Sequence, residues 1–136
     1  MLVFQIGGEE AEYVRVSNIG DHGDGWFSAD VAVAVGSFEG RYRADLNSRA
    51  FSDFAAQLGQ LYKTVSGSAR FTSYEAQLEL ELVCNDLGHI KVRGEAMDYA
   101  GTGNRLTFHL DIDQTHVPAI LSSLRQALER DPPRAV

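Results

Sequence analysis

The side chains with the greatest capacity for chemistry lie in one short segment, where His109, Asp111 and Asp113 alternate with apolar residues. In a strand, alternate side chains share one face, so an imidazole and two carboxylates would line up as ligands for a divalent metal ion. The neighbouring strand should place Arg93 near His109 and Lys91 near Asp111. Alternating charges on adjacent strands are typical of a solvated surface, which we call the charge ladder. We expect the ladder here, and a metal-dependent enzyme remains the less favoured hypothesis.

The other motifs that could support catalysis or ligand binding are incomplete. The loop at 20–25 is rich in aspartate and glycine but lacks the full ligand spacing of a calcium loop, which favours a plain turn. The glycines of residues 101–103 precede a strand, whereas a phosphate-binding loop leads into a helix. Cys84 continues an apolar strand face and should be buried and unreactive. With no serine nucleophile motif either, we expect no catalytic residue, no cofactor and no bound metal.

A strand followed by a helix occurs twice along the chain, because residues 38–62 can be aligned with residues 104–128. In both copies an apolar period of 2 gives way to a period of 3.6, which marks a strand leading into a helix. The equivalent positions include Tyr42 with Phe108, Leu46 with Ile112, Phe51 with Val117, Leu58 with Leu124, and Asn47 with Asp113. The repeat predicts one architecture built from two similar halves, residues 26–65 and 76–130, within a single domain of residues 1–136.

Hairpin turns fix the expected strand pairing. The dipeptide Gly36-Ser37 predicts a two-residue turn that pairs Val31 with Tyr42 and Asp30 with Arg43. In the second half, Glu81 should face Lys91 or Arg93, and pairing Ala96 with Leu106 would place the ring of Phe108 over Gly94. The expected strands cover residues 2–6, 13–16, 26–35, 38–46, 69–74, 78–84, 90–96 and 106–112.

Two helices complete the expected fold. The first is capped by Asn47 or Ser48 and stopped near Gly67, and the second is capped near Thr115 and ended by Asp131-Pro132-Pro133. Each half then has one apolar sheet face and one helix with a matching apolar stripe. We therefore predict an α+β fold of order ββββα-ββββα: a single curved antiparallel sheet of about eight strands, with both helices packed on one face.

Composition limits the classes of function. The 136 residues include 12 Lys and Arg against 19 Asp and Glu, a formal net charge of −7. This charge disfavours nucleic acid as a ligand and favours either a basic partner or simple solubility. A single cysteine permits no internal disulfide, and no segment reads as a signal peptide or membrane helix. We expect a cytoplasmic protein that does not bind a membrane.

Acidic residues concentrate in two stretches, residues 9–24 and residues 75–86. The second stretch has Glu75, Glu79, Glu81 and Asp86 with no Lys or Arg. Such stretches are usually solvated, but they could also form a docking surface for a cationic protein. Trp26 opens a long strand on the face opposite Phe27; if exposed there, it would suit an interface, although a core or rim position is favoured.

With its strands laid out, the chain resembles the WapI-type immunity proteins of bacterial contact-dependent or polymorphic toxin systems. The resemblance covers residues 26–128 and rests on packing and turn residues. They are Trp26 at the start of a long strand, 36–46 with Phe38 and Gly40, 51–54, 58–62, Glu75 ahead of 78–82, 86–88, and 113–115. Val117 is smaller than the residue typical of the family.

The resemblance implies a non-enzymatic protein that binds and blocks a cognate toxin domain. Family toxins include nucleases, whose clefts are basic, and an acidic sheet face could cover such a cleft. The family supplies no catalytic residues. The candidate partner-binding residues are Trp26, Glu75, Glu79, Glu81, His109, Asp111 and Asp113.

An alternative function is a small-molecule-binding module with a pocket between the sheet and the helices. Aromatic residues expected on the inner face motivate it: Phe38, Tyr42, Phe54, Phe71 and Phe108. Exposed strand edges could also pair two copies of the chain, but nothing in the sequence requires it.

Overall fold

The computed structural model describes residues 1–8, 10–21 and 24–130. Over these residues the chain forms the predicted order of four strands and a helix, twice. The first half contains β1 (Leu2–Gly7), β2 (Tyr13–Asp21), β3 (Trp26–Val35), β4 (Phe38–Asn47) and α1 (Ser48–Thr64). The second half contains β5 (Gly67–Thr72), β6 (Leu78–Cys84), β7 (His89–Met97), β8 (Arg105–Asp113), the 3₁₀ turn η1 (Gln114–His116) and α2 (Val117–Arg130). The α+β class is confirmed.

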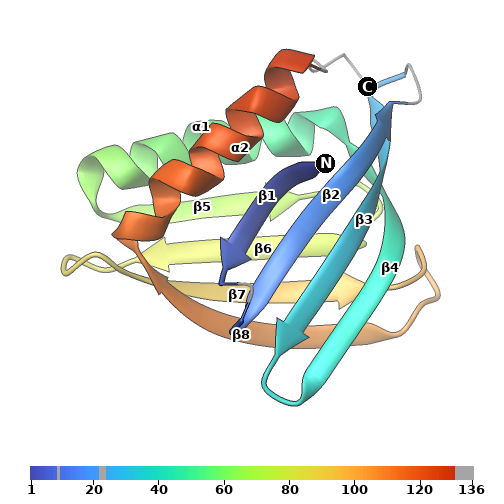
Figure 1. Cartoon of the computed structure of the whole chain (residues 1–136), viewed down its shortest axis with the longest axis horizontal. Coiled ribbons are helices and arrows are strands. Elements are labelled where there is room, and N and C mark those ends of the chain that lie inside the picture. Colours follow the sequence, from blue (N-terminus) through green and yellow to red (C-terminus); the bar gives the residue numbers. More distant parts are fainter. Residues whose placement is uncertain (9, 22–23, 131–136) are drawn as a thin grey trace.

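The strands in the described residues form two four-stranded antiparallel sheets, ordered β1-β2-β3-β4 and β5-β6-β7-β8, in place of the single sheet expected. The strands of one sheet cross those of the other (Figure 1). Short hairpins pair each strand with its neighbours in the chain, whereas α1 separates β4 from β5. Two apolar faces turned toward each other bury one another, so crossed packing is favourable.

The hairpin registers agree with those expected. Val31 pairs with Tyr42 across β3 and β4, and Asp30 lies opposite Arg43 with a 3.2 Å ion pair between them. In the second sheet Glu81 pairs with Arg93, and Gly94 pairs with Phe108. Apolar side chains of both sheets turn inward, as the buried Val31 and Val33 of β3 and Leu80 and Leu82 of β6 show.

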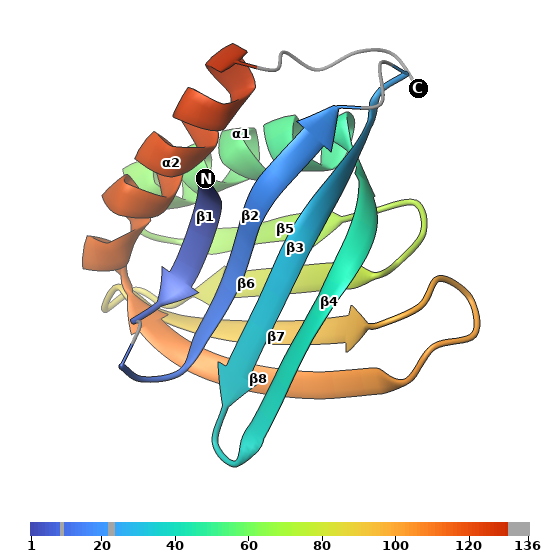
Figure 2. The same ribbon diagram turned by 45° about the vertical axis from the view of Figure 1, so that its right-hand side comes forward.

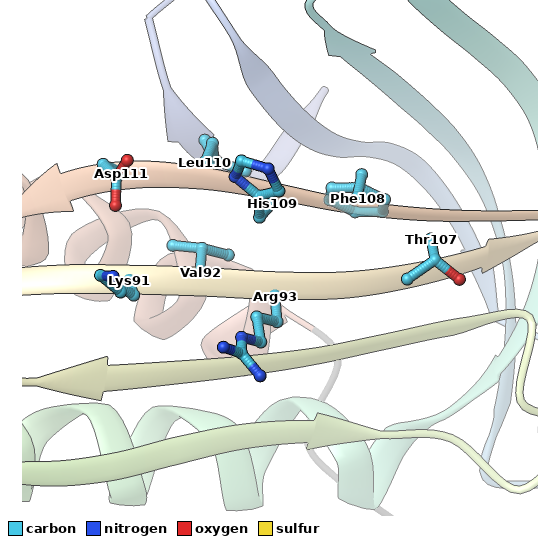
Figure 3. Close-up of a pocket in the computed structure, with 8 residues that line it drawn as sticks. All are labelled: Lys91, Val92, Arg93, Thr107, Phe108, His109, Leu110 and Asp111. Carbon is cyan, nitrogen blue, oxygen red and sulfur yellow. The ribbon is translucent and has the colours of Figure 1, made fainter.

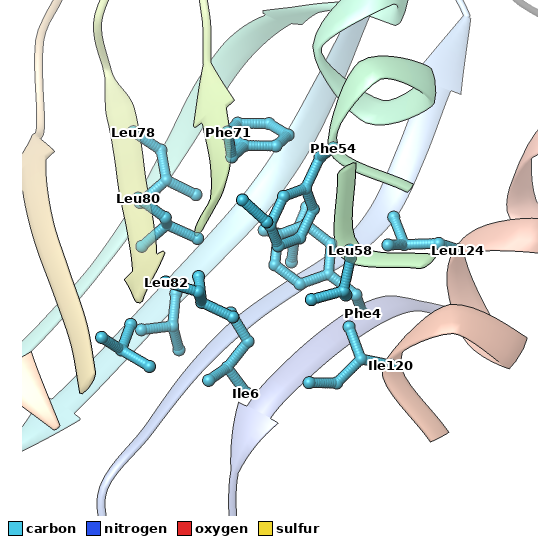
Figure 4. Packing of buried hydrophobic residues seen from close by; sticks show 14 of the residues in the cluster. Phe4, Ile6, Phe54, Leu58, Phe71, Leu78, Leu80, Leu82, Ile120 and Leu124 are labelled. Atoms are coloured by element: carbon cyan, nitrogen blue, oxygen red, sulfur yellow. The ribbon is translucent and has the colours of Figure 1, made fainter. Parts of the chain in front are cut away.

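The core lies between the sheets and beneath the helices. The ring of Phe51, on α1, has its centroid 6.4 Å from that of Phe4, 6.0 Å from Phe27 and 5.1 Å from Phe71. Since Phe4 and Phe27 belong to the first sheet and Phe71 to the second, one helical side chain contacts both. Figure 4 shows these layers meeting around Phe54, Leu58, Ile120 and Leu124.

Each helix covers the first strand of one sheet. The helix α1 packs along β5, α2 packs along β1, and the two helices contact each other. The edges that β1 and β5 would otherwise expose are thereby shielded, which is a common protection of sheet edges. Neither helix is long and apolar enough to cross a membrane, as far as the described residues show.

A buried polar side chain joins the two sheets. The Gln77 side chain accepts a hydrogen bond from the backbone N–H of Asp45 (3.0 Å), while its backbone carbonyl accepts one from the Tyr42 hydroxyl (2.6 Å). The same carbonyl also accepts from the N–H of Met97 in β7 (3.0 Å). The end of β4 is thus bonded to the start of β6 and to β7. Burial of Tyr42 raises the pKa of its hydroxyl far above the ordinary value, so it stays a neutral donor.

Several details of the sequence expectations need correction. The strand β2 runs to Asp21, so part of the expected loop is strand, because pairing with β3 resumes at Gly20 after a bulge that follows Ser17. The second helical segment is capped at Asp113, earlier than Thr115. Phe38 is 65% exposed rather than on the inner face, because the β3–β4 hairpin projects beyond the second sheet (Figures 1 and 2).

Some expectations fall outside the described residues. These are the acidic position Glu9, the loop positions His22 and Gly23, and the helix stop at Asp131-Pro132-Pro133.

Candidate protein-binding face

The outward face of the second sheet carries the predicted charge ladder. Along β6, β7 and β8, polar side chains alternate with buried apolar ones, as the strand period requires. Glu81 pairs with Arg93, Arg93 pairs with His109, and Lys91 pairs with Asp111. The expected placement of a cation opposite His109 and opposite Asp111 is confirmed.

An open groove of about 510 Å³ follows β7 and β8 on this face. Figure 3 shows Lys91 and Arg93 on β7, and Thr107, His109 and Asp111 on β8. The remaining lining residues are buried beneath the strands, so polar side chains form the accessible part of the groove. Charged and polar side chains therefore border the groove, and apolar atoms contribute most of its exposed lining.

The ladder divides into paired and unpaired charges. Arg70 forms an ion pair with Glu81, and Arg105 forms one with Glu95 at 3.2 Å. Within the described part of the chain, the side chains of Glu79, Lys91, Arg93, His109 and Asp111 form no ion pair or hydrogen bond. These exposed side chains would therefore lose no ion pair or hydrogen bond within the described residues when a partner binds.

Asp113, at the end of this face, caps the 3₁₀ turn η1. Its Oδ1 accepts hydrogen bonds from the backbone N–H of Thr115 (2.8 Å) and from the Thr115 hydroxyl, and His116 Nδ1 lies 3.5 Å away. The hydrogen bonds from Thr115 are the main reason that the pKa of Asp113 lies below its ordinary value. Asp113 therefore begins the turn that leads into α2.

The role of Thr115 can be tested by titration. Thr115→Val removes the hydroxyl but keeps the backbone N–H, so the pKa of Asp113 should rise toward its ordinary value in an NMR titration of the carboxyl carbon. A carboxyl whose pKa is lowered on folding stabilises the protein above its unfolded pKa, and this stability is lost as the pH falls through the folded value. The variant should thus be less stable than wild type at neutral pH and equal to it in strong acid. An unchanged pKa of Asp113 would contradict this assignment.

Trp26 and Glu75 lie elsewhere, beside the β5–β6 connection. The half-buried ring of Trp26 packs edge-on against Tyr74, with 5.9 Å between centroids, and Glu75 is the next residue in the chain. Asn47 holds this connection, because its Oδ1 accepts a hydrogen bond from the N–H of Tyr74 at 3.0 Å. Trp26 is therefore a rim residue, as favoured from the sequence. The 65% exposed Tyr74 was not predicted, because it lies in an irregular connection.

The structure therefore brings four of the seven candidates onto one face, namely Glu79, Glu81, His109 and Asp111. Asp113 caps the turn at one end, and Trp26 and Glu75 form a separate site. Among the described residues, no group of three or more His, Cys, Asp and Glu side chains is arranged to hold a metal ion. Cys84 is buried, and this burial raises the pKa of its thiol.

The space expected to hold a small molecule is occupied by the core. Phe54 and Phe71 are fully buried, and their rings lie 5.8 Å apart in an edge-on arrangement. Phe108 fills the position above Gly94, where even a Cβ atom would come within 2.2 Å of its ring. Phe54 and Phe71 thus pack against each other, while Phe108 borders the outer groove of β7 and β8, and Phe38 and Tyr42 border a separate open cleft.

Comparison with known proteins gives a family and a fold. Residues 4–132 match the immunity protein WapI-like family. No curated protein matches the chain. The MRP1/MRP2 structure of Trypanosoma brucei aligns at 15% identity with a TM-score of 0.52, and the alignment covers 94% of this chain and 84% of the matched chain. A guide-RNA-binding protein complex bound to a guide RNA aligns over 94% and 90%, with the same identity and TM-score.

A third solved structure is the CdiA-CT/CdiI toxin and immunity complex from Enterobacter cloacae. It aligns with 81% of this chain and 94% of the matched chain, at 11% identity and a TM-score of 0.45. At these identities, the similarity to the MRP1/MRP2 and guide-RNA structures establishes a shared fold.

Proposed function

The chain belongs to the WapI-like immunity protein family, and we propose that it is a non-enzymatic protein that neutralises a cognate bacterial toxin by binding it in the cytoplasm. The family match is the observation that carries this proposal. The partner is a protein, and the interaction is stoichiometric because the protein blocks its target and does not turn it over.

The toxin binds on the outward face of β6, β7 and β8. This face has an open groove and exposed charges without intramolecular ion pairs, so a partner can pair with them at little cost in lost contacts. The proposed contacts are Glu79, His109 and Asp111, which form no ion pair among the described residues, and Glu81, which pairs with Arg70 on β5. Asp113 lies at the end of the face, and Trp26 and Glu75 form a separate anchor.

A nuclease domain would fit the charges of this face. Its cleft combines basic walls that hold phosphates with carboxylates that hold catalytic metal ions. The acidic residues of β6 and β8 would meet the basic walls, while Lys91 and Arg93 between them would meet the carboxylates. The net charge of −7 would accelerate association with a basic domain.

Binding can be measured by calorimetry against the C-terminal domain of a toxin encoded beside this gene. We expect a one-to-one complex whose affinity falls as salt is raised, since surface charges are screened within about 10 Å at 0.1 M salt. The double variant Glu79→Lys/Asp111→Lys should bind at least roughly tenfold more weakly, because it places cations against a basic cleft.

A matched control tests whether the effect is local. Asp53→Lys/Glu129→Lys makes the same change of net charge on exposed positions of α1 and α2. The control should bind within about twofold of wild type at moderate salt. Equal losses of affinity for the two double variants would show that the toxin does not bind on the β6–β8 face. No association at low salt would remove the proposed function for that toxin.

A further inference from the structure

Two sheet edges are left without a covering helix. The first sheet ends at β1 and β4, and the second ends at β5 and β8. The helices shield β1 and β5, which leaves the edges of β4 and β8. The edge of β8 is partly covered, because β1 and β3 lie against this strand and Asp113 at its end caps η1. In the described residues no helix covers the first half of β4, which borders a cleft whose other wall includes Asp98, Asn104 and Arg105. A free strand edge is a template for another strand.

The hairpin geometry determines which backbone groups of β4 point outward. The pair that closes a two-residue turn, Val35 with Phe38, exchanges hydrogen bonds, and the bonded pairs then alternate along the strands. Glu39 and Arg41 therefore turn their N–H and C=O groups away from β3. Asp45 has the same phase, and its N–H is bonded to the Gln77 side chain. In the described residues no backbone hydrogen bond reaches the outward groups of Glu39 and Arg41.

The sequence of this open edge is symmetric in its chemistry about Gly40. The order Phe38-Glu39-Gly40-Arg41-Tyr42 places an aromatic ring at each end, and opposite charges on either side of the glycine. Within one chain, Arg41 Nε lies 3.1 Å from Oε1 of Glu39. An antiparallel copy centred on Gly40 would also bring Glu39 opposite Arg41 of the other copy twice, and Phe38 opposite Tyr42 twice. Opposite charges and aromatic pairs are the cross-strand neighbours that stabilise antiparallel strands.

We propose that this edge of β4 pairs with β4 of a second copy of the chain, antiparallel and about a twofold axis at Gly40. The β1–β4 sheets of the two copies then become one continuous sheet. The exposed ring of Phe38 gains a partner in Tyr42 of the other copy. An open cleft of about 220 Å³, lined by Phe38, Gly40 and Tyr42 among others, lies beside the edge. A Cβ atom at Gly40 would have no atom within 4 Å, so a side chain introduced at this position has room on the sheet face.

Charge exchange tests the register directly. Wild-type protein should show a concentration-dependent monomer–dimer equilibrium by analytical ultracentrifugation. Arg41→Glu turns two opposite-charge pairs into two like-charge pairs, and it should weaken the dimer by roughly tenfold or more. The double variant Glu39→Arg/Arg41→Glu restores opposite charges in this register and should recover the dimer. Arg49→Glu, the same charge change on exposed α1, should leave it intact.

A cysteine at the axis gives a second readout that does not depend on affinity. Opposed residues in a non-hydrogen-bonded antiparallel pair have Cα atoms about 4.5 Å apart, close enough for a disulfide. Gly40→Cys should therefore form a covalent dimer under mild oxidation. Ala56→Cys, on the exposed surface of α1, should remain monomeric on the same non-reducing gel.

Three results would overturn the proposal. The first is a wild-type protein that stays monomeric at millimolar concentration. The second is a dimer that Arg41→Glu leaves unchanged or that the double variant fails to restore. The third is a monomeric protein that loses toxin binding in the variant Arg41→Pro. This variant removes an outward N–H with little effect on the pairing with β3, so the loss would show that the toxin binds at this edge.

Discussion

Replacing Phe51 with alanine should lower the free energy of unfolding by about 3–5 kcal/mol, in the range for large aromatic residues removed from a core. The Phe51 side chain is 2% exposed, and its ring meets rings from both sheets. Truncation therefore leaves a cavity that neither sheet can close alone, because each is held by its own hairpins. Urea denaturation followed by circular dichroism measures the loss.

The control for this result is Phe38→Ala, which removes the same atoms from an exposed position. Measured at low concentration, where the chain is monomeric, it should change the free energy of unfolding by less than about 0.5 kcal/mol. Similar losses for both variants would show that Phe51 does not join the two sheets in the way described here.

The second large effect is expected at Gly94. A Cβ atom there would lie 2.2 Å from Cζ of Phe108 and 2.6 Å from Cε2, far inside contact distance. The ring is buried against the strand and cannot swing into solvent, so Gly94→Ala should cost about 3 kcal/mol through overpacking. Chemical denaturation of the variant tests this cost.

A compensating change separates the clash from a general preference for glycine. Adding Phe108→Leu to Gly94→Ala shortens the facing side chain and should recover part of the lost stability. Gly40→Ala is the matched control, since a Cβ atom at Gly40 meets nothing within 4 Å. If Gly40→Ala is as destabilising as Gly94→Ala, the contact with Phe108 is not the cause.

Local patterns were sufficient to predict the order of the elements, the register of β3 with β4 and the register of β7 with β8. The turn at Gly36-Ser37 leaves one register in which every inward pair is apolar, and the structure adopts it. The same reasoning placed Gly94 beneath Phe108. Hairpins are predictable because both partners and the turn lie within a short stretch of chain.

The arrangement of the two halves was not predictable from these patterns. One continuous sheet and two crossed sheets bury the same apolar faces, and the choice depends on long-range contacts such as those of Gln77. Asn47 illustrates the same difficulty, because it stands at the N-cap of α1 without making the side-chain cap bond. Its carboxamide binds the N–H of Tyr74 in a connection whose position the sequence does not reveal.

The candidate site was predictable only in part for a related reason. The alternation along β6 and β8 correctly placed Glu79, Glu81, His109 and Asp111 on one outward face. It could not show that Asp113 would be drawn into a cap, or that Trp26 and Glu75 would lie elsewhere. Period-2 patterns assign residues to a face, but they do not say where that face ends.

The contact between β1 and α2 has a consequence for synthesis on the ribosome. Among the described elements α2 is made after all of the others, and it covers β1, which is made before them. Until α2 is made, the nascent chain exposes the edge of β1 and the apolar face of its sheet. Chaperones recognise such features, which also drive aggregation. A chain that stops before α2 should therefore expose the edge of β1 and be prone to aggregation.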